Sequence, residues 1–351
     1  MKICIIINNL GMGGAERLVI DDVNEMLRRG MPVKLITLKP EKDGKSLSGQ
    51  CKISDSDWTK LDIKGIFDLI GWIRLTKALI KEKPDLLITH LWFSNTLGRI
   101  CGKLAGVRKV ITFEHNVYDE LKTGKMFFLD RILQSKSDKI IAVSEAVKKS
   151  LIRHNIHEKN IIVIPNGIDT SKFNDAAGAN LGTKFKFLFI GRLIYQKGID
   201  ILLEAFRQVN DAILIIAGDG DEKERLQDQA KDLEIQNRVL FLGNRIDVPE
   251  LLVSADCFVL ASRYEGLPMV LIEAMAAGKA IIVSDFDSAG EVIKNEENGL
   301  IVKRESVGEL ANAMNRIKSD QNLRNSLAQN AKKDSEKFSI KNHIDRLLSI
   351  L

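Results

Sequence analysis

The stretch KICIIINNLGMGGAERL, at residues 2–18, joins an isoleucine-rich run to a glycine loop and then to a helix-like sequence. The run over 2–8 is apolar at almost every position, which is typical of a strand buried on both faces of a parallel sheet. Gly11, Gly13 and Gly14 suit a tight turn from such a strand into a helix. The stretch therefore predicts one β-α unit of a doubly wound α/β fold.

The same alternation recurs along the chain and restarts after a polar stretch. Strands are predicted at 2–8, 33–38, 85–89, 109–113, 139–143 and 161–164, and again at 185–190, 212–217, 238–242, 257–260, 280–283 and 299–302. We expect two Rossmann-like domains, at 1–165 and 185–334, with a linker at 166–184 and an interdomain cleft. A helix at about 335–351 is a candidate to pack back on the first domain.

Composition narrows the class of protein. The 351 residues are 45% hydrophobic and 28% charged, and no apolar run approaches the length that crosses a bilayer. Four scattered cysteines show no metal-ligand spacing, so we expect neither a metal site nor disulfides. Residues 1–165 hold 28 Lys and Arg against 19 Asp and Glu, whereas 166–351 hold 24 against 28. The basic half favours an anionic partner such as a membrane surface, although a plain solubilising surface explains it equally well.

The run EGLPMVLIEAMAAG, at 265–278, has the character of a binding site. It places Glu265 and Glu273 eight residues apart around the start of a short apolar helix, with Pro268 in the first turn. The amides of Val270 and Leu271 then lie at the positive end of the helix dipole, which favours an anion such as a phosphate.

A second loop, GRLIYQKG at 191–198, presents two cations directly after a predicted strand. Arg192 offers a planar fork and Lys197 a mobile point charge, and both can converge on one diphosphate. The glycine loop after the first strand resembles a dinucleotide fingerprint. However, Glu16 replaces its third glycine and the second strand ends in Lys39 rather than an acidic residue, which disfavours a nicotinamide enzyme.

The motifs GGAE, NGID, GRLxxQKG, AGDG, FxGN and the pair of glutamates eight residues apart occur in the order found in family 4 retaining glycosyltransferases, and together they cover nearly the whole chain. The sequence therefore resembles that family, which implies the GT-B fold. The resemblance also implies that the second domain holds a nucleotide-diphosphate sugar and the first holds the acceptor. UDP-sugar is the expected donor class, with GDP-sugars as the alternative.

The resemblance assigns roles by position. Arg192, Lys197, Glu265 and His115 are implied to be catalytic, with the two cations on the diphosphate and His115 on the donor sugar. The implied donor site consists of Gly14, Arg192, Lys197, Asn244, Arg245, Glu265, Gly266, Leu267, Pro268, Met269, Val270, Leu271 and Glu273. His90, Trp92, Lys122 and Lys125 are weaker candidates for the acceptor side.

A transfer that retains the configuration of the sugar's anomeric carbon needs one of two routes. Either a second carboxylate attacks from the face opposite the leaving group, or the acceptor attacks from the front face with help from the leaving phosphate. The motifs place no such second carboxylate. The resemblance implies the front-face route without a metal or other cofactor. Two strings, Asp55-Ser56-Asp57 and Asp285-Phe286-Asp287, have the Asp-x-Asp (DxD) pattern of some metal-binding sites. A departure from relatives at Phe286–Glu291, around Ser288, leaves the sugar contacts there undefined.

Two apolar segments bear on membrane contact. Met126–Phe128, flanked by Lys122, Lys125 and Arg131, suits an anionic membrane, or equally a helix that packs inward. A stripe at helical spacing predicts a buried helix face, with Trp72 off the stripe and free to reach lipid or acceptor. This stripe comprises Ile63, Ile66, Phe67, Ile70, Ile73 and Ile80.

These observations predict a cytoplasmic glycosyltransferase, peripheral on the inner face of the plasma membrane, that transfers a sugar to a glycan or lipid-linked acceptor in cell-surface polysaccharide biosynthesis. A GT-B nucleotide-sugar epimerase is the main alternative. A non-enzymatic module that binds anionic lipid or nucleic acid would explain only the basic half, and we expect no nucleic-acid partner.

Overall fold

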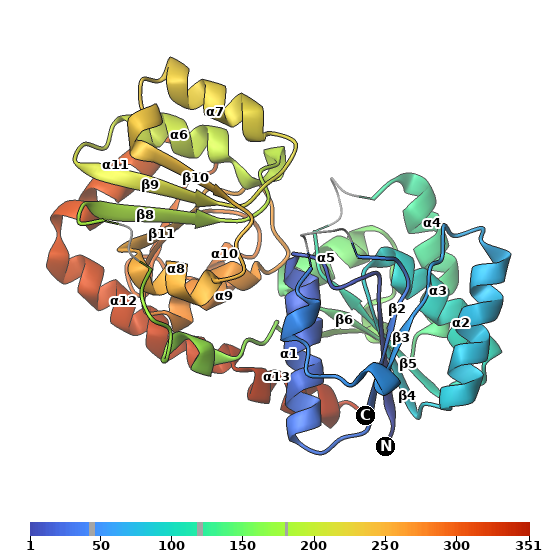
Figure 1. Ribbon diagram of the computed structural model, residues 1–351. Helices are drawn as coiled ribbons and strands as arrows, with labels where there is room; N and C mark the ends of the chain where they lie inside the picture. Colours follow the sequence, from blue (N-terminus) through green and yellow to red (C-terminus); the bar gives the residue numbers. More distant parts are fainter. Residues whose placement is uncertain (42–45, 118–121, 180–181) are drawn as a thin grey trace. The chain divides into compact units, whose positions relative to one another are not determined.

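The computed structural model describes residues 1–41, 46–117, 122–179 and 182–351. Two compact units make up the chain, one of Met1–Gly167 with Ile340–Leu351 and the other of Ile168–Ser339. Figure 1 colours them along the sequence. Each unit is a parallel sheet with helices on both faces, so the prediction of two doubly wound α/β domains is confirmed.

The first unit contains a seven-stranded sheet in the order β3-β2-β1-β4-β5-β6-β7. Every residue of β1 is buried because helices cover both faces of the sheet. The strands are β1 (Ile3–Ile7), β2 (Val33–Thr37), β3 (Trp58–Lys60), β4 (Leu86–His90), β5 (Lys109–Glu114), β6 (Lys139–Ala142) and β7 (Ile161–Val163). The helices are α1 (Gly14–Arg28), α2 (Leu69–Glu82), α3 (Trp92–Leu104), α4 (Gly124–Leu133), α5 (Glu145–Arg153) and α13 (Ile340–Ser349).

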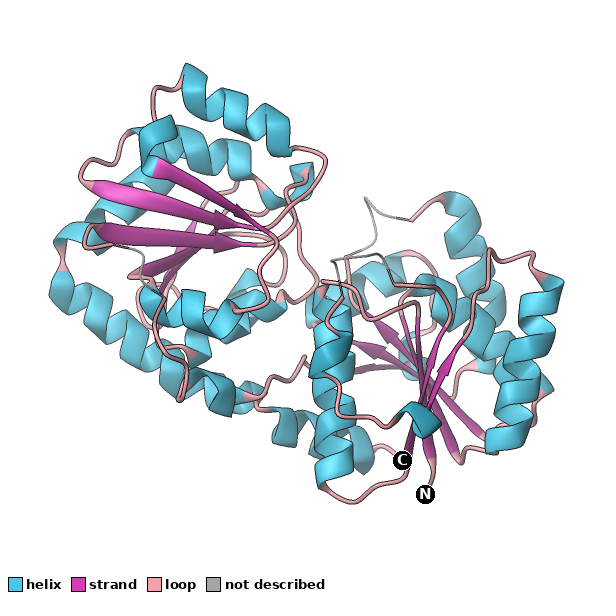
Figure 2. Ribbon diagram, viewed as in Figure 1, coloured by secondary structure: helices cyan, strands magenta, loops and turns pink. Residues whose placement is uncertain are grey.

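The last helix, α13, belongs to the first unit although it follows the second in sequence. It packs against α1, and both lie on the face of the sheet opposite α2, α3 and α4 (Figures 1 and 2). Arg29 at the end of α1 forms an ion pair with Asp345 of α13 at 2.5 Å. The end of the chain thereby returns to the unit in which the chain began.

Helix α2 turns a different face inward from the one predicted. Ile63 is buried as expected, but Leu75 and Leu79 make the helix's core contacts and Trp72 packs beside them. The predicted stripe is wrong at four positions, which are exposed: Phe67 (93%), Ile70 (69%), Ile73 (55%) and Ile80 (49%). The helix carries apolar side chains on two faces, so the spacing alone did not identify the buried one.

The second unit contains a six-stranded sheet in the order β10-β9-β8-β11-β12-β13. Figure 2 shows helices above and below it. The strands are β8 (Phe185–Ile190), β9 (Ala212–Ala217), β10 (Val239–Gly243), β11 (Cys257–Leu260), β12 (Ala280–Ser284) and β13 (Leu300–Val302). The helices are α6 (Ile199–Arg207), α7 (Lys223–Asp232), α8 (Val248–Ser254), α9 (Met269–Ala276), α10 (Ala289–Val292), α11 (Val307–Ser319) and α12 (Gln321–Ser335).

The polar stretch at 166–184 is largely part of the second unit. From Ile168 onward it belongs to that unit, where the Ile168 amide donates to the carbonyl of Phe338 at 2.9 Å. Phe173 is buried in the short helix Thr170–Phe173, which contacts α8 and α9. The stretch predicted as a linker thus contains an apolar side chain that is buried in the second unit. In the described residues, no helix is both long and apolar enough to cross a membrane.

Candidate active site

The polar loops of the second unit follow the two central strands of its sheet. Strand β8 lies between β9 and β11. After β8 the chain continues to β9 on one side, and after β11 it continues to β12 on the other side, so the strand order reverses between β8 and β11. Ligands of open α/β sheets bind at this kind of topological switch point, outside the carboxyl ends of the strands. The loops at 191–198 and 261–268 both begin there.

Two glycines allow these loops to pack closely. Gly198 has φ +61°, and a Cβ there would collide with the carbonyl oxygen of Ala261. Gly218 has φ +150°, and a Cβ would collide with the carbonyl oxygen of Gly191. A side chain at either position would push apart the loops that follow β8, β9 and β11.

Glu265 is the centre of a buried polar cluster. Lys197 Nζ lies 2.5 Å from Glu265 Oε1, and the hydroxyl of Ser262 donates to the same oxygen at 2.6 Å. Gln196 Nε2 lies 3.5 Å from Glu265 Oε2 and donates to the Tyr264 carbonyl at 2.8 Å. The Ser288 hydroxyl lies 3.4 Å from the Glu265 carbonyl oxygen. The cluster fixes the carboxylate by its Oε1 and leaves Oε2 more weakly held.

Arg263 ties the same two loops together. Its backbone amide donates to the Gln196 carbonyl at 2.8 Å, and its guanidinium donates to the Tyr195 carbonyl at 2.6 Å. The guanidinium also pairs with Asp200 at 2.8 Å and stacks over the Tyr195 ring at 3.8 Å. The sequence prediction missed Arg263, Gln196 and Ser262, although all three lie within three residues of Lys197 or Glu265.

The two predicted diphosphate cations differ in setting. The Lys197 side chain is mostly buried and paired, as described above. The Arg192 side chain is exposed, and it has no hydrogen bond or ion pair to any described residue. An unpaired guanidinium at a strand end is available to a ligand, whereas Lys197 must share its charge with Glu265.

Helix α9 begins directly after these loops. Pro268 precedes its first residue, and no side chain caps its N-terminus. Gly266, Leu267 and Met269 lie in the turn and the first helical position, with Val270 and Leu271 following in the first turn. Glu273, one turn on, is buried. The predicted donor residues at 265–271 thus lie along one continuous segment beside the β8 and β11 loops.

Asn244 and Arg245 lie after β10, two strands from β8 in the sheet. Arg245 forms an ion pair with Asp247 at 2.5 Å at the surface. Three of the four Asp residues in the two Asp-x-Asp strings also have cationic partners: Asp57 pairs with Lys34, and both Asp285 and Asp287 pair with Arg304. Within the described residues no group of His, Cys, Asp and Glu is arranged to hold a metal ion.

The candidate residues of the first unit lie at the carboxyl edge of its own sheet. Gly14 is the first residue of α1, His90 is the last of β4, Trp92 is the first of α3, and His115 follows β5 directly. His90 and His115 are in contact, with His90 Nδ1 3.1 Å from His115 Nε2. Strands β1 and β4 are neighbours, so these residues surround the switch point of this sheet.

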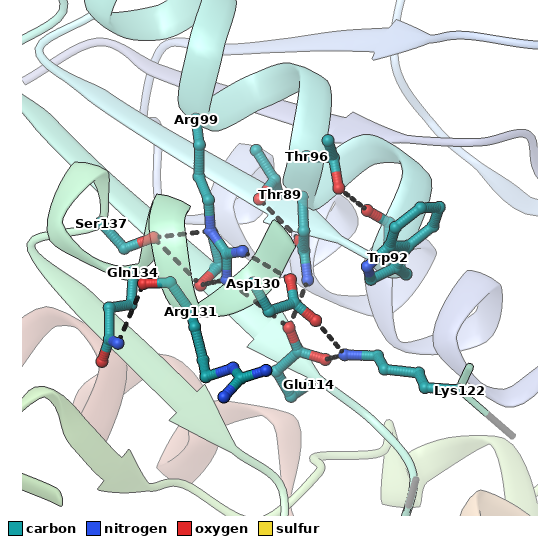
Figure 3. Close-up of polar contacts among 12 residues, drawn as sticks. Thr89, Trp92, Thr96, Arg99, Glu114, Lys122, Asp130, Arg131, Gln134 and Ser137 are labelled. Atoms are coloured by element: carbon teal, nitrogen blue, oxygen red, sulfur yellow. Dashed lines mark hydrogen bonds and ion pairs between the residues drawn. The ribbon is translucent and has the colours of Figure 1, made fainter. Parts of the chain in front are cut away.

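Lys122, a candidate for the acceptor side, lies buried inside the first unit. Figure 3 shows its ammonium group between two carboxylates, Glu114 at 3.1 Å and Asp130 at 2.8 Å. Asp130 also pairs with the buried Arg99 at 2.8 Å. The network links α3, α4 and β5. Lys125, which follows Lys122 by three residues, is exposed on α4.

Comparison with known proteins agrees with this architecture. The family model "Glycosyltransferase Family 4" matches residues 12–172, and "Glycosyl transferases group 1" matches residues 171–334. The solved structure of Anabaena Alr3699/HepE in complex with UDP has a TM-score of 0.85 at 22% identity, with 100% of both chains covered. The fold is therefore that of the GT-B glycosyltransferases.

Two curated relatives are more similar in sequence. An Escherichia coli UDP-Gal:alpha-D-GlcNAc-diphosphoundecaprenol alpha-1,3-galactosyltransferase is 31% identical over 309 residues, covering 82% of this chain and 80% of the relative. A Campylobacter jejuni N,N'-diacetylbacillosaminyl-diphospho-undecaprenol alpha-1,3-N-acetylgalactosaminyltransferase is 32% identical over 311 residues, covering 82% of each. The chain belongs to family 4 of the glycosyltransferases and is a glycosyltransferase.

Proposed function

We propose that this enzyme transfers a hexose-type sugar, with retention of configuration, from a UDP-sugar to a glycan carried on a lipid diphosphate during cell-surface polysaccharide biosynthesis. The observation that carries the proposal is the Lys197–Glu265 cluster in the loops at the switch point of the second sheet, where the exposed Arg192 also lies. The two relatives described above are named for undecaprenyl-diphosphate acceptors, and the structural neighbour was solved with UDP.

In this proposal the cations stabilise the leaving nucleotide. Arg192 and Lys197 bind the diphosphate, and the amides at the start of α9 add the positive end of a helix dipole. Glu273 binds the ribose, and the backbone near Asn244 and Arg245 binds the base. As the sugar–phosphate bond breaks, negative charge builds up on the phosphate and these groups stabilise it.

Glu265 acts on the sugar. Its Oε1 is held by Lys197 and Ser262, which orients the carboxylate, while the weakly held Oε2 is available to a sugar hydroxyl. The acceptor hydroxyl attacks from the side of the departing phosphate, and a phosphate oxygen takes its proton. This front-face route needs no carboxylate nucleophile on the opposite face of the sugar.

The donor class is tested by the melting temperature of the protein with UDP-, GDP- and ADP-sugars. A ligand that binds only the folded protein raises the melting temperature by mass action, so we expect a shift with UDP-sugars alone. Turnover of the active donor should persist in EDTA, because the proposal assigns the phosphate charge to Arg192, Lys197 and α9. Activity that is lost in EDTA and restored by Mg²⁺ would contradict the metal-free route, and a shift only with GDP-sugars would contradict the donor.

We also propose that the protein docks peripherally on an anionic membrane through the outer face of α2. Exposed apolar side chains on and before this helix alternate with exposed cations, which is the pattern of a helix that lies in a lipid interface. The apolar set is Phe67, Leu69, Ile70, Ile73 and Ile80, and the basic set is Lys64, Arg74, Lys77, Lys81 and Lys83. On α4, Phe128 is exposed but Phe127 is buried against His154, so that segment offers less apolar surface.

Vesicle co-sedimentation tests this surface. The wild-type protein should bind vesicles that contain anionic lipid and release them at high salt, because both burial and charge contribute. The Ile70→Ser/Ile73→Ser variant should bind at least about tenfold more weakly, since two exposed apolar side chains that the lipid would bury are lost. Ile246→Ser, at an exposed apolar residue of the second unit, is the matched control. Equal binding by the α2 variant and the control would exclude this face.

A further inference from the structure

Two neutral histidines form a hydrogen-bonded pair in the first unit. His90 ends β4 and His115 follows β5, and the parallel register of these strands sets His90 opposite Phe113. The Nδ1 of His90 lies 3.1 Å from the Nε2 of His115, and both residues are buried. The His90 ring stacks on Phe113, with ring centroids 4.6 Å apart, and faces the His115 ring at 5.3 Å. The position of each ring is therefore fixed.

Both imidazoles are neutral at neutral pH. Burial lowers the pKa of His115 to about 3, with a further contribution from the charge of His343. Burial, followed by the charges of His115 and His343, also holds the pKa of His90 well below its ordinary value. A neutral imidazole carries one proton, so the contact needs one ring to donate and the other to accept.

The second nitrogen of His90 decides between the two arrangements. His90 Nε2 is buried and has no hydrogen-bond partner among the described residues. If His115 donated, His90 would carry its own proton on Nε2 as a buried N–H without an acceptor. If His90 donates from Nδ1, its Nε2 is only an unfilled acceptor. Buried N–H groups without partners are the rarer case in proteins, because their desolvation is not compensated.

The geometry points to His90 as a positioning residue that donates Nδ1–H to His115 Nε2 and so holds His115 in the tautomer protonated on Nδ1. Leu91, the next residue, has φ +72° and ψ +148°, a conformation that is costly for a residue with a side chain. This strain occurs directly beside the ring that must be held in place.

The consequence concerns what His115 offers to a substrate. In this tautomer Nδ1 of His115 carries its own proton and Nε2 accepts the proton from His90, so neither nitrogen offers the lone pair that a general base needs. This consequence rests on the proposed function, which places His115 at the sugar. The tautomer itself does not rest on it.

The tautomer is measured by long-range ¹H–¹⁵N NMR of the full-length protein labelled at its five histidines. Loss of signals in His115→Gln assigns the resonances of His115. We expect wild-type His115 to be protonated on Nδ1, and to be protonated on Nε2 in His90→Phe, which removes the donated proton. His157→Gln, at an exposed histidine, should leave the pattern unchanged. A wild-type His115 protonated on Nε2 would overturn the inference.

Two substitutions at His90 separate positioning from packing. Phe preserves ring volume and stacking on Phe113 but offers no N–H, whereas Asn offers an N–H near the place of Nδ1 but loses the ring. We expect His90→Phe to lower kcat about tenfold or more and His90→Asn to stay within about threefold of wild type. A kcat for His90→Phe that equals or exceeds that of His90→Asn would overturn the positioning role. If no sugar donor is turned over by the wild-type protein, the proposed function fails while the NMR result stands on its own.

Discussion

At the scale of single residues, the contact between Lys197 and Glu265 makes the two side chains one functional unit. Each charge is mostly buried and has the other as its partner, so removing either one leaves the remaining charge without compensation. The sequence predicted both residues for the site but treated Lys197 and Arg192 as equivalent cations. Only the fold shows that Lys197 is paired whereas Arg192 has no ion pair with a described residue, because the pairing joins residues 68 positions apart in sequence.

We predict that Lys197→Ala and Glu265→Ala each lower kcat by about 100-fold, because each removes a group that stabilises the transition state. The double variant should be less active than either by much less than the product of the two losses, since the residues act together. Steady-state turnover of the nucleotide sugar measures this. Lys231→Ala breaks an exposed ion pair with Asp228 and should keep wild-type rates. Near-normal rates in both site variants would remove these residues from the mechanism.

At the scale of secondary structure elements, the sequence predicted most strands to within a residue or two. The predicted strand at 185–190 is β8 as observed, and the run at 2–8 contains β1. Long isoleucine-rich runs have few other stable environments than a sheet buried on both faces. The short β3 was missed because three residues carry no periodic signal. The prediction of the inward face of α2 was wrong because its exposed isoleucines have the same helical spacing as a core stripe.

The network around Lys122 joins three such elements and leads to a stability prediction. Replacing Lys122 by Met removes from the buried Glu114 and Asp130 a cation that both of them contact, while Arg99 still pairs with each, and this should lower the free energy of unfolding by on the order of 3 kcal/mol. All three tryptophans, Trp58, Trp72 and Trp92, lie in the first unit, so tryptophan fluorescence during urea denaturation reports on that unit.

Lys125→Met is the matched control for this measurement, since Lys125 is exposed on α4. It should change stability by less than about 0.5 kcal/mol. If Lys122→Met is equally harmless, Lys122 is free to serve the acceptor side, as the sequence first indicated.

At the scale of the whole molecule, the chain leaves the first unit after Gly167 and returns to it at Ile340. The helix that returns is held by more than apolar contacts. His343 of α13 lies 3.4 Å from Asp22 of α1, and its Nδ1 lies 2.7 Å from the carbonyl oxygen of Pro165. Sequence alone suggested a helix that packs back, but neither Asp22 nor His343 occurs in a motif. Their pairing depends on residues more than 300 positions apart, which no local pattern records.

The contacts of His343 with Asp22 and with the Pro165 carbonyl should make the stability of the first unit depend on pH. Burial alone would lower the pKa of His343, but Asp22 and the Pro165 carbonyl outweigh burial and the nearby Arg346, and they raise the pKa above its ordinary 6.5. The buried His90 and His115 also face this charge from β4 and the end of β5. A group with a raised pKa in the folded state stabilises the fold fully below its unfolded pKa, and this stabilisation is lost as pH rises through the folded pKa.

We therefore predict that the contribution of His343 to the free energy of unfolding, taken as the difference between wild type and His343→Gln in tryptophan fluorescence, is larger at about pH 5.5 than at about pH 9, by about 1.4 kcal/mol for each unit by which its pKa is raised. His90 and His115, whose pKa values are lowered, contribute in the opposite direction in both proteins. His343→Gln keeps a donor for the Pro165 carbonyl but cannot be protonated, so this part of the pH dependence should disappear while the remaining titrations stay. His157→Gln, at an exposed histidine, should retain the wild-type dependence. If His343→Gln and wild type lose stability in parallel over this range, the returning helix is held by packing alone and the charge on His343 contributes nothing.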